Sequence, residues 1–306
     1  MDPSFVVGVS RSGTTYLHHL FNTHPRIRLS YEGHLFNEGW EIYRRYQDLT
    51  KRKQFEQLID ELVRCDANEP LNNWIGNSVP DSVDELFERH LKNPSFTGLI
   101  ENIYQLPGPV DCWGNKTLRV ELSEGILKHW PKAKFVILIR DPRAVFASQK
   151  KFFPERRLKY SAIYWNIHTA SINEGYIPRE QYLLFRYEDF VQNANECLGQ
   201  TLEFLGLSSQ EDMVKLMLEA QPASARSLQK WRSSLSDEEI HMIESICFDE
   251  MKNYGYEPEL AKSGIQLGTL TKAVETFLDK KSNIPWNPLV WRRKNLIKRY
   301  WMTIRK

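Results

Sequence analysis

Apolar positions along the chain form two alternating patterns. Short apolar runs, most clearly the β-branched run at 134–139, predict buried strands. Between these runs, apolar residues recur at intervals of three and four and predict helices. Because strands and helices alternate without hairpin turns, the pattern predicts an α/β, P-loop-like fold of three layers, in which helices cover both faces of a central parallel sheet.

The predicted elements follow one another to about residue 253. Strands are expected in the apolar run that begins at Phe5 and at 26–30, 110–117, 134–139 and 181–188. Helices are expected after Gly13, within about 35–92, and at 119–129, 160–176, 193–205, 210–219 and 236–253. Residues 1–260 are therefore expected to form one domain, in which 35–92 is a helical insertion that shapes an acceptor pocket.

Residues 261–306 are expected to form a C-terminal helical appendage of aromatic and basic character. Three tryptophans are interleaved with arginines and lysines here, and acidic residues are absent after Asp279. The favoured interpretation is a helix that docks its tryptophans on the core. Peripheral contact with a membrane or another anionic partner is the alternative.

Composition excludes several classes of protein. Hydrophobic residues make up 41% of the 306 residues and charged residues 26%, as in ordinary globular proteins. A net charge of +2 argues against a nucleic-acid partner, and no apolar run approaches the length of a transmembrane span. The four cysteines lack metal-site or disulfide spacing, so a metal is not expected. With a strand so close to Met1, a cytoplasmic location is expected if the chain is the whole natural protein.

The first apolar run leads into a turn with the glycine spacing of a phosphate loop. Gly8 and Gly13 are separated by four residues, and in such loops backbone N–H groups and a helix N-terminus bind phosphate oxygens. Thr14 and Thr15 stand where nucleotide triphosphatases have Lys followed by Ser or Thr, and Arg11 is the nearest cation. The loop is therefore suited to an anion but poorly equipped for magnesium-nucleotide chemistry.

Two further strands are expected to end in functional side chains. Lys116 closes one of them, and Arg140 follows another, eight positions before Ser148. Asp141 and Pro142 predict a helix N-terminus at this second junction. Because the carboxyl ends of parallel strands line one crevice, the sequence predicts two anion subsites, one at the phosphate loop and one at Arg140.

The two motifs resemble those of the PAPS-dependent sulfotransferases. Residues 8–15 match the family's G-x-x-R-S-G-T-T loop for the 5′-phosphosulfate at every defined position. Residues 140–148 match its R-D-P-R-x-x-x-x-S motif for the 3′-phosphate. The likeness covers about residues 5–255 and is closest to the tyrosylprotein and carbohydrate branch. It implies PAPS as donor, PAP as product and no required metal.

The resemblance also implies residue roles. Arg11 and Lys116 would stabilise the transferring group and the leaving 5′-phosphate, and Glu32 would act as the base. His18, His19, His24 and His34 stay open as alternative bases, because they also lie near the loop in sequence. The residues implied to bind the donor are Arg11, Ser12, Gly13, Thr14, Thr15, Tyr16, Arg140, Ser148, Tyr187, Lys230, Trp231 and Arg232.

Several alternatives remain at this point. Tyr187 is equally suited to the adenosine site and to the core, and Lys230 and Arg232 fit a solvated helix face. Asp141 and Arg143 are interpreted as structural or supporting residues. The chain could act as a P-loop nucleotide kinase-like phosphotransferase or as a non-catalytic PAP-binding protein. The acceptor hydroxyl belongs to a glycan, a Tyr peptide, a lipid or a small molecule, and the sequence leaves a homodimer open.

Overall fold

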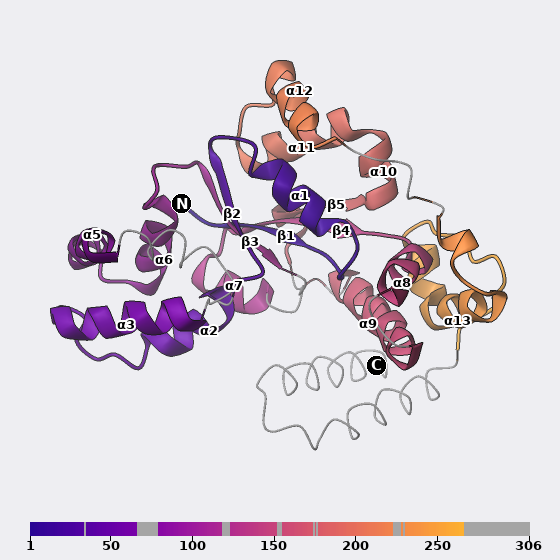
Figure 1. Cartoon of the computed structure of the whole chain (residues 1–306), viewed down its shortest axis with the longest axis horizontal. Coiled ribbons are helices and arrows are strands. Elements are labelled where there is room, and N and C mark those ends of the chain that lie inside the picture. Colours follow the sequence, from indigo (N-terminus) through magenta and orange to yellow (C-terminus); the bar gives the residue numbers. More distant parts are fainter. Residues whose placement is uncertain are drawn as a thin grey trace.

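A parallel five-stranded sheet forms the centre of the molecule (Figure 1). The computed structural model describes residues 1–33, 35–65, 79–117, 123–151, 155–173, 175, 177–222, 228 and 230–265. The strands are β1 (Ser4–Val7), β2 (Ile27–Tyr31), β3 (Cys112–Thr117), β4 (Lys134–Ile139) and β5 (Tyr182–Arg186). They lie in the order β2-β3-β1-β4-β5, and each neighbouring pair is parallel. The predicted parallel sheet is therefore confirmed.

Helices cover both faces of the sheet, as predicted (Figure 1). One face carries α1 (Thr14–Phe21), α10 (Tyr187–Gln192), α11 (Ala194–Leu205) and α12 (Glu211–Ala220). The helices of the other core cluster are α2 (Leu35–Tyr43), α3 (Arg52–Cys65), α5 (Val79–Lys92), α6 (Phe96–Gln105), α7 (Ser123–His129), α8 (Pro142–Lys150), α9 (Glu155–Asn173) and α13 (Asp237–Asn253). Alternate residues of each strand point to opposite faces of the sheet, so Val6 and Val136 pack in the core on one face and Phe5 and Phe135 in the core on the other.

Two helices were not predicted from the sequence. Helix α6 lies between the helical block expected to end at about 92 and the strand expected at 110–117, where no element was predicted. It begins after Ser95, whose side chain accepts a hydrogen bond from the Gly98 backbone N–H at 3.0 Å. Helix α10 starts directly at the end of β5, so the observed strand, Tyr182–Arg186, is shorter than the strand predicted at 181–188. The helical pattern at 35–92 is confirmed for α2, α3 and α5.

Some expectations fall outside the described part of the chain. Residues 266–306, which include nearly all of the expected C-terminal appendage, are among them, as are 66–78 and 118–122. Within the described residues, all four cysteines are free thiols. A search of the same residues finds no helix with the length and apolar character to cross a membrane.

Candidate active site

Two glycines shape the loop between β1 and α1. A Cβ on Gly8 would lie 2.5 Å from the Leu138 carbonyl oxygen, so the loop can pass this close to β4 only without a side chain. Gly13 has φ 95°, and a Cβ there would lie 2.4 Å from the Tyr187 ring. The path of the loop between β4 and Tyr187 therefore requires glycine at both positions.

The phosphate loop and the second anion motif touch each other. Arg11 Nε donates a hydrogen bond to Ser148 Oγ at 3.0 Å, and an Arg140 N–H donates to the Arg11 carbonyl oxygen, also at 3.0 Å. Arg11 itself has φ 74°, in the left-handed region that residues with a Cβ seldom adopt. The structure therefore brings the two motifs of the sequence together at one edge of the sheet.

Arg140 is held on several sides at the end of β4. Its guanidinium lies 4.6 Å from the centre of the Tyr187 ring, and its carbonyl oxygen accepts from Trp165 Nε1 at 3.0 Å. Arg140 Nε is buried, and neither it nor the buried Ser12 hydroxyl has a hydrogen-bond partner among the described residues. Buried donors of this kind are normally satisfied, so an anion at the loop fits both groups.

The carboxyl ends of β2 and β3 carry a second cluster. Lys116 is 1% exposed, and its ammonium forms an ion pair with the half-exposed Glu32 carboxylate. The same ammonium lies 4.3 Å from the centre of the Tyr31 ring, where the aromatic face attracts a cation. Glu32 has φ 54°, and its N–H donates to the Lys116 carbonyl oxygen at 2.9 Å. The proposed base and the proposed cation are therefore direct partners.

The histidines near the loop differ in their surroundings. His18 Nε2 is 2.9 Å from the Leu29 carbonyl oxygen, and burial lowers the pKa of His18 to about 4. His24 Nδ1 accepts from the Arg26 N–H at 3.1 Å, and burial lowers the pKa of His24 as well. His19 is exposed, and His34 lies outside the described residues. In both residues burial disfavours the protonated ring, while the backbone contacts fix the ring's position.

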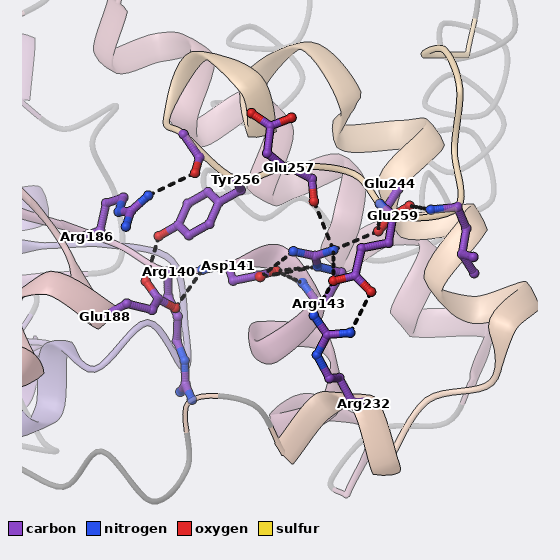
Figure 2. Close-up of polar contacts among 12 residues, drawn as sticks. Arg140, Asp141, Arg143, Arg186, Glu188, Arg232, Glu244, Tyr256, Glu257 and Glu259 are labelled. Carbon is purple, nitrogen blue, oxygen red and sulfur yellow. Dashed lines mark hydrogen bonds and ion pairs between the residues drawn. The ribbon is translucent and has the colours of Figure 1, made fainter.

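A buried charge network lies behind the second motif (Figure 2). Arg143 forms two ion pairs at 2.8 Å, one with the Asp141 side chain and one with Glu244, which is fully buried. Asp141 also accepts from the Arg143 N–H at 2.8 Å and so caps α8, as predicted from Asp141 and Pro142. Glu244 accepts backbone N–H groups of residues 259–261. Arg140 extends away from this cluster (Figure 2).

The other side of Asp141 is held by two residues that sequence reasoning missed. Glu188 accepts from the Asp141 N–H at 3.2 Å and from the Tyr256 hydroxyl at 2.8 Å. Burial is the main cause that raises the pKa of Glu188. Glu188 belongs to the R-Y-E-D stretch at 186–189, which was the one available signal in the sequence.

The remaining predicted donor residues lie in varied surroundings. Trp231 is 3% exposed and lies beside the Arg143 guanidinium, 4.2 Å from it, while Arg232 pairs with Glu259 and Lys230 is exposed. The Tyr16 hydroxyl donates to the Gln221 carbonyl oxygen at 3.3 Å, and burial raises the pKa of Tyr16 to about 12. Thr14 is buried in the first turn of α1, and Thr15 Oγ1 is 3.2 Å from the Tyr31 hydroxyl.

Comparisons with known proteins identify the family. A family model described as "Sulfotransferase family" matches residues 3–212. Carbohydrate sulfotransferase 3 of Tetronarce californica is 24% identical over an alignment of 166 residues, and the match covers 40% of this chain and 36% of that protein. This match therefore spans only about a third of the relative's length.

Solved structures support the same fold. The sulfotransferase domain from the Synechococcus PCC 7002 olefin synthase has a TM-score of 0.56 and 17% identity, covering 84% of this chain and 95% of that one. The sulfotransferase domain from the curacin biosynthetic pathway has a TM-score of 0.54 and 15% identity, and the match covers 84% of this chain and 99% of that one. Because the family model covers well over half of the sequence, from β1 into α12, the chain belongs to the sulfotransferase family.

Proposed function

We propose that the protein transfers a sulfuryl group from PAPS to a hydroxyl acceptor and releases PAP. The observation that carries this proposal is the 3.0 Å hydrogen bond between Arg11 and Ser148, which joins the phosphate loop to the second anion motif. Two anion-binding motifs in contact at one sheet edge suit a donor that carries two separate phosphate groups. A nucleoside triphosphate would leave the Arg140 motif without a ligand.

The chain's own residues divide between the two ends of such a donor. The loop backbone, Ser12, Thr14 and Thr15 would hold the 5′-phosphosulfate, since they surround the N-terminus of α1. Arg140 and Ser148 would hold the 3′-phosphate. The further donor contacts that we propose are Gly13, Tyr16, Tyr187, Lys230, Trp231 and Arg232.

PAPS supplies an activated sulfuryl group, so the protein's task is positioning and charge stabilisation. In the transfer, the bond between sulfur and the oxygen bridging to the 5′-phosphate breaks, and a bond between sulfur and the acceptor oxygen forms. Glu32 takes the acceptor's hydroxyl proton. Arg11 and Lys116 stabilise the negative charge on the leaving 5′-phosphate and on the sulfuryl oxygens, each worth about 3 kcal/mol of barrier.

The described contacts imply an exchange when the donor enters. Arg11 binds Ser148, and Lys116 binds Glu32. Both cations must turn part of their hydrogen-bonding capacity toward the donor, because its phosphosulfate carries the larger charge. Glu32 then becomes available to the acceptor hydroxyl.

The acceptor is proposed only as a class, a compound with a free hydroxyl group. A glycan is the first choice to test, because the curated relative is a carbohydrate sulfotransferase. Tyr peptides, lipids and phenols complete the panel. The cytoplasmic location and the closeness to the tyrosylprotein and carbohydrate branch remain predictions from the sequence.

Two measurements test the proposal. Titration calorimetry with PAP, ADP and ATP should give the tightest binding for PAP, and preference for ATP would refute the donor. Transfer of sulfur-35 from labelled PAPS to the acceptor panel should be measurable and should fall strongly in Glu32→Gln. Binding of PAP without transfer to any acceptor would favour a non-catalytic PAP-binding protein.

A further inference from the structure

We propose that Asn115 is a positioning residue that keeps Glu32 in place while Lys116 turns toward the donor. This inference rests on the proposed function, in which Glu32 takes the acceptor's proton. Asn115 and Lys116 are neighbours on β3, and each contacts the segment that carries Glu32.

The strand register explains how both neighbours reach the same turn. On β2, Ser30 pairs with Asn115 and Tyr31 with Lys116, so Glu32 is the first residue beyond the paired strand. Successive side chains of a strand point to opposite faces of the sheet. Lys116 therefore approaches Glu32 from one face, and Asn115 approaches the same turn from the other.

Asn115 fixes the backbone of this turn. Its Nδ2 donates to the Gly33 carbonyl oxygen at 3.3 Å and to Ser30 Oγ at 2.9 Å, which uses both N–H groups of the amide. Ser30 Oγ is in turn 2.6 Å from the Tyr104 hydroxyl. Asn115, Ser30 and Tyr104 are all at most 3% exposed, so these bonds form in a buried environment where they are rigid.

The backbone at Glu32 needs such support. With φ 54° it occupies the left-handed region, which residues with a Cβ rarely adopt unless the surrounding structure holds them there. Three contacts hold it: the Glu32 N–H to the Lys116 carbonyl, the ion pair with the Lys116 ammonium, and the Asn115 bond to Gly33. If the turn relaxed, the carboxylate would move away from the site.

The three contacts respond differently to the donor. The ion pair weakens when the Lys116 ammonium shifts toward an anion, whereas the Asn115 bond lies on the opposite face and is unaffected. In the donor-loaded state the turn is therefore held by the Asn115 side chain and by the backbone bond from the Glu32 N–H to the Lys116 carbonyl oxygen, and Asn115 is the side chain among these contacts. Its effect belongs to the transfer step and not to donor binding.

The test compares Asn115→Ala with Ser30→Ala. Asn115→Ala should lower kcat about tenfold to a hundredfold, the usual cost of a misplaced group, with the KM for PAPS and the calorimetric Kd for PAP unchanged. Ser30→Ala removes the hydrogen bonds of Ser30 Oγ with Tyr104, Asn115 and the Gly114 carbonyl oxygen but keeps the bond from Asn115 to Gly33, so its kcat should stay near that of the wild type. Asn115→Thr, which suits a strand but cannot reach Gly33, repeats the test if the alanine variant folds poorly.

A second readout does not require an acceptor. Hydrogen exchange of the PAP-loaded protein should become faster at the Glu32 amide in Asn115→Ala and not in Ser30→Ala. Unchanged kcat and unchanged exchange in Asn115→Ala would overturn the inference, and so would a parallel loss of PAP affinity. Absence of transfer by the wild type, or full activity of Glu32→Gln, would instead refute the proposed function.

Discussion

The two cationic ends of the candidate site are supported in different ways. Arg140 stands on a junction fixed by buried charges, in which Asp141 and Glu244 both pair with Arg143 (Figure 2). Lys116 is itself buried, but the carboxylate with which its ammonium pairs, that of Glu32, is half-exposed. A charge held by several buried partners stays in place, whereas a charge held by one partner can change it. The comparison suggests a fixed donor end and an exchangeable transfer end.

The largest effect is expected from a substitution that disrupts the buried charges behind Arg140. Arg143→Ala leaves Asp141 and Glu244 buried without their cation, so the free energy of unfolding should fall by about 3–5 kcal/mol. Urea denaturation followed by fluorescence measures it. The matched control is Arg232→Ala, whose ion pair with Glu259 is largely exposed and should cost at most about 1 kcal/mol. Equal losses in the two variants would show that the buried network does not fix this end.

Breaking the exchangeable end should have the opposite profile. Lys116→Ala removes a cation from the transferring group, so kcat should fall about a hundredfold to a thousandfold. Stability should change little, because the remaining Glu32 carboxylate is 39% exposed and can be hydrated. Sulfur-35 transfer and urea denaturation measure the two effects, with the exposed Lys128 changed to alanine as the control. Intact transfer in Lys116→Ala would remove this residue from the mechanism.

A pH experiment sharpens the view of the transfer end. Burial lowers the pKa of His18 from the ordinary 6.5 to about 4. Between pH 6.5 and pH 4, His18 is therefore protonated in the unfolded chain but neutral in the folded protein. His18 therefore contributes stability that is lost as the pH falls from 6.5 toward 4, about 2 kcal/mol of it between pH 7 and pH 5, in addition to the loss from other buried histidines such as His168. Urea denaturation at both pH values should show a loss about 2 kcal/mol larger in the wild type and in the exposed-site control His19→Gln than in His18→Gln. An equal loss in His18→Gln would show that the His18 imidazole does not contribute.

The smallest expected effect concerns the proposed change of partner by Lys116, from Glu32 to the donor. A carbodiimide should form a zero-length cross-link between Lys116 and Glu32 in the free protein, because ammonium and carboxylate are in contact. Saturating PAP should lower the yield by drawing the ammonium toward its 5′-phosphate. Mass spectrometry measures the yield against the cross-link of Lys128 to Glu124 on α7, which PAP should leave unchanged. An equal yield with and without PAP would mean that Lys116 keeps its partner.

The sequence predicted the parts of the site that are local along the chain. The loop ending at Gly13 and the junction from Arg140 into α8 combine strand, turn and cap within a few residues, so their conformation follows from neighbouring side chains. The sequence also predicted that Lys116 lies at the same edge of the sheet as the other strand ends, but not that β3 is the neighbour of β2. The direct pairing of Lys116 with Glu32 was not predicted.

The supporting network could not be predicted, because its contacts join distant segments. Glu244 lies on α13 and would be read as a solvent-facing charge, yet it is fully buried against Arg143. Tyr256 reaches Glu188 from beyond the last described helix. Such residues acquire their surroundings only from the tertiary fold, and a single sequence does not reveal which charges pair there.

The proposed anion sites at the loop and at Arg140 both depend on the close contact between Gly13 and the Tyr187 ring. A methyl group at this position would be driven into the Tyr187 ring, and that ring supports the Arg140 guanidinium. The displacement would thus reach the proposed 3′-phosphate contact at Arg140 as well as the loop. Among natural variants, a side chain at position 13 should accompany the loss of both proposed halves of donor binding.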